Sequence, residues 1–264
     1  MYDNYRSNVR IDSSGVKKMK NDGFYERVEV IHEVVESKKS EICYNLIVDL
    51  LAKGTNRKGQ ERILDIGCGD GSFIAKFRDR CKVFGVDISA KAIKLAEKAG
   101  VNSYRLDVST ERLPFEDECF DLVYMGDVIE HLINPDFAIT EVARVMKPSG
   151  FLILSTPNLA SWLNRLLLLI GLQPLYSEVS TTINFGRPSV HTQFDNIPVG
   201  HLRLFTFRAL KEFLAYYSFR IVRARGASSQ MRTKVLSEVD KILSRIVPLA
   251  SIVIVVACKN GQHD

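Results

Sequence analysis

The sequence lacks any apolar run long enough to cross a membrane and any cysteine pattern typical of a metal or disulfide site. Two apolar stretches, residues 166–172 and 250–257, fall well short of the ~20 residues of a membrane-spanning helix. The five cysteines are scattered and form no C-x-x-C pair, which argues against a zinc knuckle and a disulfide framework. Residues 1–20 are polar and charged, without the apolar core of a signal peptide. We therefore expect a reducing, cytoplasmic setting.

The chain also lacks a strong charge of one sign and any internal repeat. Its net charge of +5, from 36 basic and 31 acidic residues, permits an anionic partner without requiring one. A hydrophobic content of 46% over 264 residues is sufficient for a sizeable core. We expect a flexible N-terminal segment, 1–36, followed by one domain, 37–264, with no second domain.

Residues 62–73, Arg-Ile-Leu-Asp-Ile-Gly-Cys-Gly-Asp-Gly-Ser-Phe, organise the rest of the chain. A short apolar run of the kind found in buried parallel strands leads into three glycines at alternate positions, and apolar residues then recur at helical spacing. The pattern predicts a strand, a glycine-rich turn and a helix. In an open α/β sheet such a turn lies at the carboxyl end of a strand, where ligands bind.

The spacing of the glycines is G-x-G-x-G, which differs from the G-x-G-x-x-G of dinucleotide-phosphate loops. Asp65 and Asp70 flank the first two glycines, and two carboxylates repel a phosphate and attract a cation. S-adenosylmethionine carries an ammonium and a sulfonium group and no phosphate. Residues 64–71 resemble the first motif of the class I S-adenosylmethionine-dependent methyltransferases. The alternative is that these glycines form only a turn.

Two further strands end in acidic residues that match this resemblance. Asp87 ends the run 82–87 and lies about twenty residues after the turn, where a nucleotide site places an acceptor for ribose hydroxyls. Its alternative role is to cap the helix 89–98, although Ser89 can supply that cap. Asp107 and Val108 follow the run 101–106, and the resemblance implies that they contact adenine. The predicted cofactor-binding residues are Asp65, Gly67, Cys68, Gly69, Gly71, Asp87, Ile88, Asp107, Val108 and Met125.

The phrase L-P-F-x-D-x-x-F-D-x-V at residues 113–123 is the most family-specific stretch. It leads into a fourth strand, and a fifth follows at 151–158, so strands and helices alternate five times. This alternation predicts an α/β fold with a parallel, doubly wound sheet. The resemblance implies a Rossmann-like sheet of seven strands with the last one antiparallel, and runs 219–224 and 250–258 fit the sixth and seventh strands.

Asp127, Glu130 and His131 follow the fourth strand and can converge, because positions three and four apart share a helical face. Two carboxylates and an imidazole suit a divalent metal that lowers the pKa of a substrate hydroxyl, with His201 or His191 as a further ligand. The set resembles the E-x-x-E-H plus distal His of methyltransferases acting on the RNA 3′-terminal ribose, and a similar set in ubiquinone-pathway O-methyltransferases. Asp127 stands where those families carry Glu. The alternatives are His131 or His201 as a metal-free base, and a structural role for Glu130 and His131.

Two insertions depart from the family pattern. Residues 160–205 contain an apolar helix, 160–172, and a long polar stretch that we interpret as a lid over the acceptor. The helix has two alternative roles: it closes the core, or it makes a peripheral contact with a membrane surface, with Arg165, Arg187 and Arg203 near the head groups. A second, helical insertion covers 226–247.

The chain has no Asn-Pro-Pro-Tyr or Pro-Cys motif after the fourth strand, which argues against methylation of nucleic-acid bases. We therefore predict methyl transfer to a hydroxyl of a small molecule, lipid or glycan. The first alternative is an RNA 3′-terminal ribose methyltransferase, although few aromatic residues are interleaved with the basic residues Arg203, Arg208, Arg220, Arg223 and Arg225. The second alternative is a non-catalytic S-adenosylmethionine-binding protein.

Overall fold

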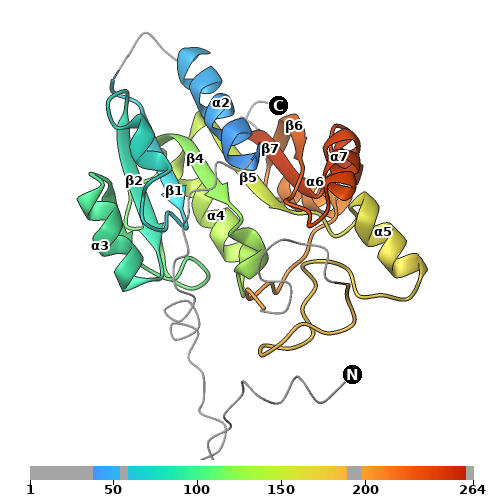
Figure 1. Cartoon of the computed structure of the whole chain (residues 1–264). Coiled ribbons are helices and arrows are strands. Elements are labelled where there is room, and N and C mark those ends of the chain that lie inside the picture. Colours follow the sequence, from blue (N-terminus) through green and yellow to red (C-terminus); the bar gives the residue numbers. More distant parts are fainter. Residues whose placement is uncertain (1–37, 54–58, 189–197, 260–264) are drawn as a thin grey trace, which may run out of the picture.

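The structure is a computed structural model that describes residues 38–53, 59–188 and 198–259 of the 264-residue chain. It shows one central sheet flanked by helices (Figure 1). The predicted segment 1–36 and His191 lie outside the described residues. Among the helices within the described ranges, none is both long and apolar enough to cross a bilayer.

Seven strands form the sheet, in the order β3-β2-β1-β4-β5-β7-β6. They are β1 (Arg62–Ile66), β2 (Lys82–Asp87), β3 (Asn102–Arg105), β4 (Phe120–Gly126), β5 (Met146–Pro157), β6 (Phe219–Ala227) and β7 (Ile252–Lys259). The first five strands pair in parallel, and β7 runs antiparallel to both of its neighbours, β5 and β6. The predicted seven-stranded, Rossmann-like sheet with an antiparallel last strand is confirmed.

Helices cover both faces of the sheet because its central strands are apolar on both sides. In β1, Leu64 and Ile66 belong to one buried cluster, which includes residues of α4 (Pro135–Val145) and α6 (Phe207–Tyr216). Ile63 belongs to a second cluster with α2 (Lys38–Lys53), α3 (Ala90–Lys98) and the 3₁₀ turn η2 (Ile74–Phe77). The remaining elements are η3 (Ile129–His131), α5 (Trp162–Leu169), α7 (Lys234–Leu243) and η4 (Val247–Leu249).

Most α-helices begin at a side chain that accepts a hydrogen bond from a backbone N–H three residues later. Ser89 caps α3, as the sequence predicts, and Asn134, Ser161, Thr206 and Thr233 cap α4, α5, α6 and α7. These residue types are the preferred N-caps, which explains where the helices start.

The candidate site lies between β1 and β4, where the order in which strands are added to the sheet reverses its direction. The chain starts in the middle with β1, adds β2 and β3 on one side, and then returns to add β4 and β5 on the other. The loops after β1 and β4 therefore diverge at the carboxyl edge, which opens a ligand-binding crevice.

Several elements differ from their predicted form. The predicted helix after the glycine turn is only the single turn η2, because the chain reverses at once: the amides of Arg80 and Cys81 donate to Phe77 O (2.9 and 3.1 Å). The apolar helix predicted at 160–172 is shorter, Trp162–Leu169, and the described parts of the lid after it contain no helix or strand. In the second insertion, β6 extends to Ala227 and α7 occupies part of the remainder.

Candidate functional site

The glycine turn after β1 requires glycine for its conformation and for its close packing. Gly67, Gly69 and Gly71 have φ of 73°, 55° and 75°, in the left-handed region that other residues rarely adopt. A Cβ at Gly67 would lie 2.4 Å from Val128 Cγ2, and one at Gly71 would lie 2.9 Å from Ala96 Cα. The turn therefore packs directly against the start of η3 on one side and against α3 on the other.

Asp87 at the end of β2 holds the turn and retains acceptor capacity. Its Oδ2 accepts from Gly69 N (2.9 Å) and its Oδ1 from Ser89 N (2.8 Å). The side chain of Ser89 accepts from Ala92 N (3.2 Å), so Ser89 caps α3. A carboxylate has about four acceptor positions, and two of those on the half-exposed Asp87 remain for a ligand hydroxyl pair. This geometry fits the predicted ribose role.

The predicted adenine-side residues follow β3, the neighbour of β2. Asp107 Oδ1 accepts from Ser109 N (2.8 Å), and Asp107 and Val108 are both half-buried. Ile88, also half-buried, lies next to Asp87, and its carbonyl accepts from Arg105 Nε (3.1 Å). Met125, at the end of β4, is fully buried. Parallel pairing of β2 with β3 places Asp87 and Asp107 along one edge of the sheet.

Asp65 is a buried acid that a cationic ligand would complement. It is 3% exposed, and among the described residues none donates a hydrogen bond to its carboxylate. Burial, with a smaller contribution from Asp87, raises the pKa of Asp65 well above its ordinary value. A nearby positive charge would favour its ionised form. The pattern fits the ammonium and sulfonium groups of S-adenosylmethionine better than a phosphate.

Glu130, His131 and His201 come together beside this turn. One potential ligand atom from each residue lies within 4.8 Å of the others, and the two imidazole rings are 4.7 Å apart. Glu130 is fully buried: its Oε2 accepts from Thr156 Oγ1 (3.0 Å), and Oε1 has no partner among the described residues. The amides of Leu202 and Arg203 donate to Glu130 O (2.7 and 2.9 Å), which brings the distal histidine to η3.

Backbone carbonyls orient both histidines. His131 Nδ1–H donates to Gly200 O (3.1 Å), and His201 Nδ1–H donates to Tyr176 O (3.0 Å). Because a carbonyl can only accept, this assignment places the proton on Nδ1 and leaves Nε2 as the basic nitrogen of each ring. Metal-binding histidines typically have such a second hydrogen bond.

Burial favours the uncharged forms of the three side chains in this cluster. It raises the pKa of Glu130 to about 8, with Asp127 as a further cause. Burial and the neighbouring His201 lower the pKa of His131 to about 4, and burial also lowers the pKa of His201. Near neutral pH the apo cluster is therefore mainly a carboxylic acid and two neutral imidazoles, and a divalent cation would favour the ionised Glu130.

Asp127, the fourth predicted ligand, is not in this cluster. Its carboxylate pairs with Lys39 and accepts from Ser155 Oγ (2.8 Å), and its backbone has a left-handed φ of 55°. Burial alone would raise the pKa of Asp127, but the charge and hydrogen bond of Lys39 lower it. The structure thus brings together three of the four proposed ligands and directs Asp127 toward α2.

Lys39 is a site residue that the sequence analysis missed. It lies in the first turn of α2, next to Lys38, which forms an exposed pair with Glu41 (2.8 Å). The sequence signal that could have identified Lys39 is its helical spacing. Lys39 lies four residues before the buried Cys43 and therefore on the same, apolar side of the helix.

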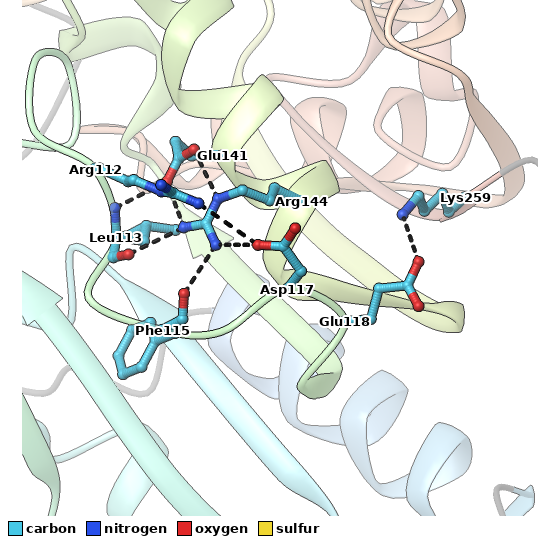
Figure 2. Close-up of polar contacts among 8 residues, drawn as sticks. All are labelled: Arg112, Leu113, Phe115, Asp117, Glu118, Glu141, Arg144 and Lys259. Carbon is cyan, nitrogen blue, oxygen red and sulfur yellow. Dashed lines mark hydrogen bonds and ion pairs between the residues drawn. The ribbon is translucent and has the colours of Figure 1, made fainter.

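The family-specific phrase 113–123 forms a structural clamp (Figure 2). The guanidinium of Arg144 in α4 donates to the carbonyls of Leu113 (3.0 Å) and Phe115 (2.8 Å) and to the carboxylates of Asp117 (2.7 Å) and Glu141 (2.6 Å). Glu141 also accepts from Leu113 N (2.9 Å). The phrase therefore fixes the loop before β4 onto α4.

The fold and the site define the class of this protein. Residues 64–154 match the family described as "Methyltransferase domain". Residues 64–154 therefore form a methyltransferase domain, and the sheet order and the glycine turn agree with the class I type, whose cofactor is S-adenosylmethionine.

Curated relatives match part of this chain. The chain is 35% identical over 128 residues to an uncharacterised protein of Methanocaldococcus jannaschii, covering 48% of this chain and 58% of the relative. It is 36% identical over 102 residues to a ubiquinone biosynthesis O-methyltransferase of Sinorhizobium fredii, covering 37% and 41%. The chain thus spans about half the length of the curated relatives it matches.

Solved structures show the same fold. The PH0226 protein of Pyrococcus horikoshii aligns with a TM-score of 0.55 at 23% identity, over 93% of this chain and all of that one. An S-adenosylmethionine-dependent methyltransferase of Archaeoglobus fulgidus aligns with a TM-score of 0.52 at 21% identity, over 83% and 94%.

Proposed function

We propose that this protein transfers a methyl group from S-adenosylmethionine to a hydroxyl oxygen of a small-molecule, lipid or glycan acceptor. The observation that carries the proposal is the cluster of the buried Glu130 with the half-buried His131 and His201 next to the glycine turn. Val128, at the start of η3, packs directly on Gly67, so the segment that carries Glu130 and His131 borders the predicted cofactor site.

The chain's own residues bind and orient the reactants. Asp87 would accept from the ribose hydroxyls, Asp107 and Val108 would contact adenine, and Asp65 would lie near the positive groups. The cofactor, when bound, supplies an electrophilic methyl group on a positively charged sulfur. An acceptor oxygen must lie ~3 Å from that methyl carbon and opposite the sulfur, so positioning and exclusion of water contribute much of the rate.

The cluster supplies the means to remove the acceptor's proton. Its donor set of two imidazole nitrogens and one carboxylate fits a divalent metal. Glu130 Oε1, which has no partner within the described ranges, and the hydrogen bonds of both histidines to backbone carbonyls support that fit. Glu130, His131 and His201 would hold the ion, which would lower the pKa of a bound hydroxyl. Without a metal, Nε2 of His131 or His201 is the candidate base.

The RNA alternative has less support from the basic residues. Arg208 forms an ion pair with Glu212 (2.9 Å), and Arg223 pairs with Asp49 of α2 (3.2 Å). These arginines are therefore partly neutralised, whereas a single-strand groove combines free cations with aromatic stacking surfaces.

The test is transfer of labelled methyl groups to lipid, glycan and RNA fractions, with and without a chelator. We expect label in a hydroxyl-bearing lipid or glycan fraction, and we expect Glu130→Gln, which keeps the side-chain shape, to lose any stimulation by divalent metal. Label confined to RNA would replace this proposal with the RNA alternative. Cofactor binding without transfer to any fraction would favour the non-catalytic role.

A further inference from the structure

Helix α5 presents an unusually apolar outer face. Leu166, Leu168, Leu169 and Ile170, at and just after its C-terminal end, are 51%, 57%, 82% and 69% exposed. Helix α5 lies at the edge of the molecule, away from the sheet (Figure 1). A contiguous exposed apolar patch on a helix is typical of an interaction surface.

This exposure does not come from a poorly packed helix. The opposite face of α5 buries Leu163 and Leu167 in a cluster with Leu175 and Met231. The side chain of Asn164, itself fully buried, accepts from Leu175 N (2.7 Å) and donates to Asn158 O (3.2 Å).

A second anchor links α5 to α7 and to Ser251, the residue before β7. Trp162 Nε1 donates to Asp240 Oδ1 (2.7 Å). The buried Asp240 also accepts from Ser251 Oγ (2.7 Å) and from Ser229 N (2.7 Å). The helix is thus held rigidly with its leucines facing outward.

A basic pocket adjoins this apolar face. It encloses about 380 Å³ and is lined by Ala160, Arg165, Thr206, Phe207, Arg208, Lys211 and Pro248. Among the described residues, Arg165 and Lys211 form no ion pair, while Arg208 pairs with the exposed Glu212. Lys211 Nζ lies 5.3 Å from the centre of the Phe207 ring. The pocket therefore has a net positive charge with an apolar wall.

The pocket and the leucines belong to one surface. Arg165, Leu168 and Leu169 are spaced i, i+3 and i+4, so they share the face opposite the buried Leu163 and Leu167. Arg165 also lines the pocket, which makes it the link between the cations and the apolar stripe. Apolar residues beside a cluster of cations are the two features that bind an interfacial helix to anionic lipid.

We infer that α5 and this pocket dock the protein on an anionic phospholipid bilayer, with the leucines at the boundary between head groups and acyl chains and Arg165 and Lys211 contacting lipid phosphates. Charge complementarity favours this occupant over an uncharged surface. The contact does not depend on the proposed function. If both hold, it places the acceptor site near the bilayer, because the carbonyl of Tyr176, shortly after α5, orients His201.

The experiment is co-sedimentation of the full-length protein with vesicles of phosphatidylcholine alone or with phosphatidylglycerol added. We expect binding that requires phosphatidylglycerol and weakens as salt is raised. The double variant Leu168→Ser/Leu169→Ser and the double variant Arg165→Glu/Lys211→Glu should each weaken it by about tenfold or more. All four side chains are exposed, so these variants keep the buried face of α5.

A matched control is Lys94→Glu/Leu95→Ser on α3, where both residues are exposed and the helix lies at the opposite edge of the sheet. It should bind vesicles like the wild type. Absence of binding to phosphatidylglycerol vesicles would overturn the inference, as would equal loss in the control. A self-association that the leucine variant abolishes, without vesicle binding, would instead identify a second copy of the chain as the occupant.

Discussion

Asp87 combines a structural and a predicted binding role in one side chain. Its two carboxylate oxygens accept hydrogen bonds from the backbone amides of Gly69 in the glycine turn and of Ser89, the N-cap of α3. Both hydrogen bonds fix the orientation of the carboxylate at the edge of the crevice. An acid with fixed geometry is well suited to recognise a pair of adjacent hydroxyls, because the cofactor does not have to organise it.

Replacing Asp87 with alanine should weaken S-adenosylmethionine binding by ~2 kcal/mol or more, about thirtyfold, because hydrogen bonds to a charged group are lost. Titration calorimetry measures the effect. Asp79→Ala, which removes a highly exposed carboxylate outside the crevice, is the control and should bind normally. A thermal melt separates loosening of the glycine turn from loss of the ribose contact, and undiminished affinity would refute the ribose role.

His131→Ala should leave cofactor affinity unchanged and lower turnover by ~10²-fold or more, because proton removal from the acceptor is impaired. Calorimetry and single-turnover methyl transfer measure the two quantities separately. If the rate stays at the wild-type value, His131 has a structural role.

Helical spacing and the family resemblance predicted Glu130, His131 and His201 as neighbours, but not the partner of Asp127. The pairing with Lys39 joins residues 88 positions apart and depends on how α2 packs across the sheet. Side-chain polarity indicates that a residue needs a partner, whereas only the tertiary arrangement decides which one.

At the scale of elements, the clamp of α4 on the loop before β4 explains why the phrase 113–123 is distinctive. Hydrogen bonds from Arg144 lower the pKa of Glu141 below its ordinary value. Between the folded and the unfolded pKa of Glu141, this carboxylate therefore binds fewer protons in the folded state than in the unfolded state. Glu141 therefore contributes stability above its unfolded pKa, ~4.3, and this contribution is lost as the pH falls through the folded pKa.

Glu141→Gln should accordingly lower the free energy of unfolding by ~1–3 kcal/mol at pH 7, and by less at pH 3. Urea unfolding at the two pH values measures both differences. A difference that is the same at pH 7 and pH 3 would contradict the role of the ionised carboxylate. Glu97→Gln on the exposed surface of α3 is the control and should change little at either pH.

Element type was predictable where periodicity and length agreed, and less so where they did not. The buried strands and capped helices were predicted from apolar runs and N-cap residues. The spacing of Phe73, Ile74 and Phe77 fits a helix as well as the single turn η2, and the immediate reversal at residues 78–81 decides between them. The interpretation of residues 160–205 as an inserted lid stays a prediction, and polar, non-periodic sequence does not predict a conformation.

For the whole molecule, five alternations of strand and helix predicted a parallel, doubly wound sheet, since parallel neighbours need crossovers, but they did not predict the order of the strands. The antiparallel direction of β7 had no local signal and was implied only by the family resemblance, and the position of β7 between β5 and β6 was not predicted. The acidic strand ends at Asp65, Asp87 and Asp107 then predict a preference for a cationic ligand over a phosphate-bearing one.

S-adenosylmethionine at about 100 times its Kd should therefore raise the free energy of unfolding by ~2.7 kcal/mol, because it binds only the folded state. A thermal-shift measurement tests this, with NAD at the same concentration as the comparison. Stabilisation by NAD and not by S-adenosylmethionine would contradict the assignment of the crevice as a binding site for S-adenosylmethionine.

Trp162 is the chain's one tryptophan, and its indole is bonded to Asp240 at the junction of α5 and α7. Intrinsic fluorescence excited at the indole band therefore reports on this junction alone, without labelling or engineered probes. Trp162 lies within about two helical turns of the exposed leucines of α5, so a shift in its fluorescence emission on adding vesicles would follow docking in real time.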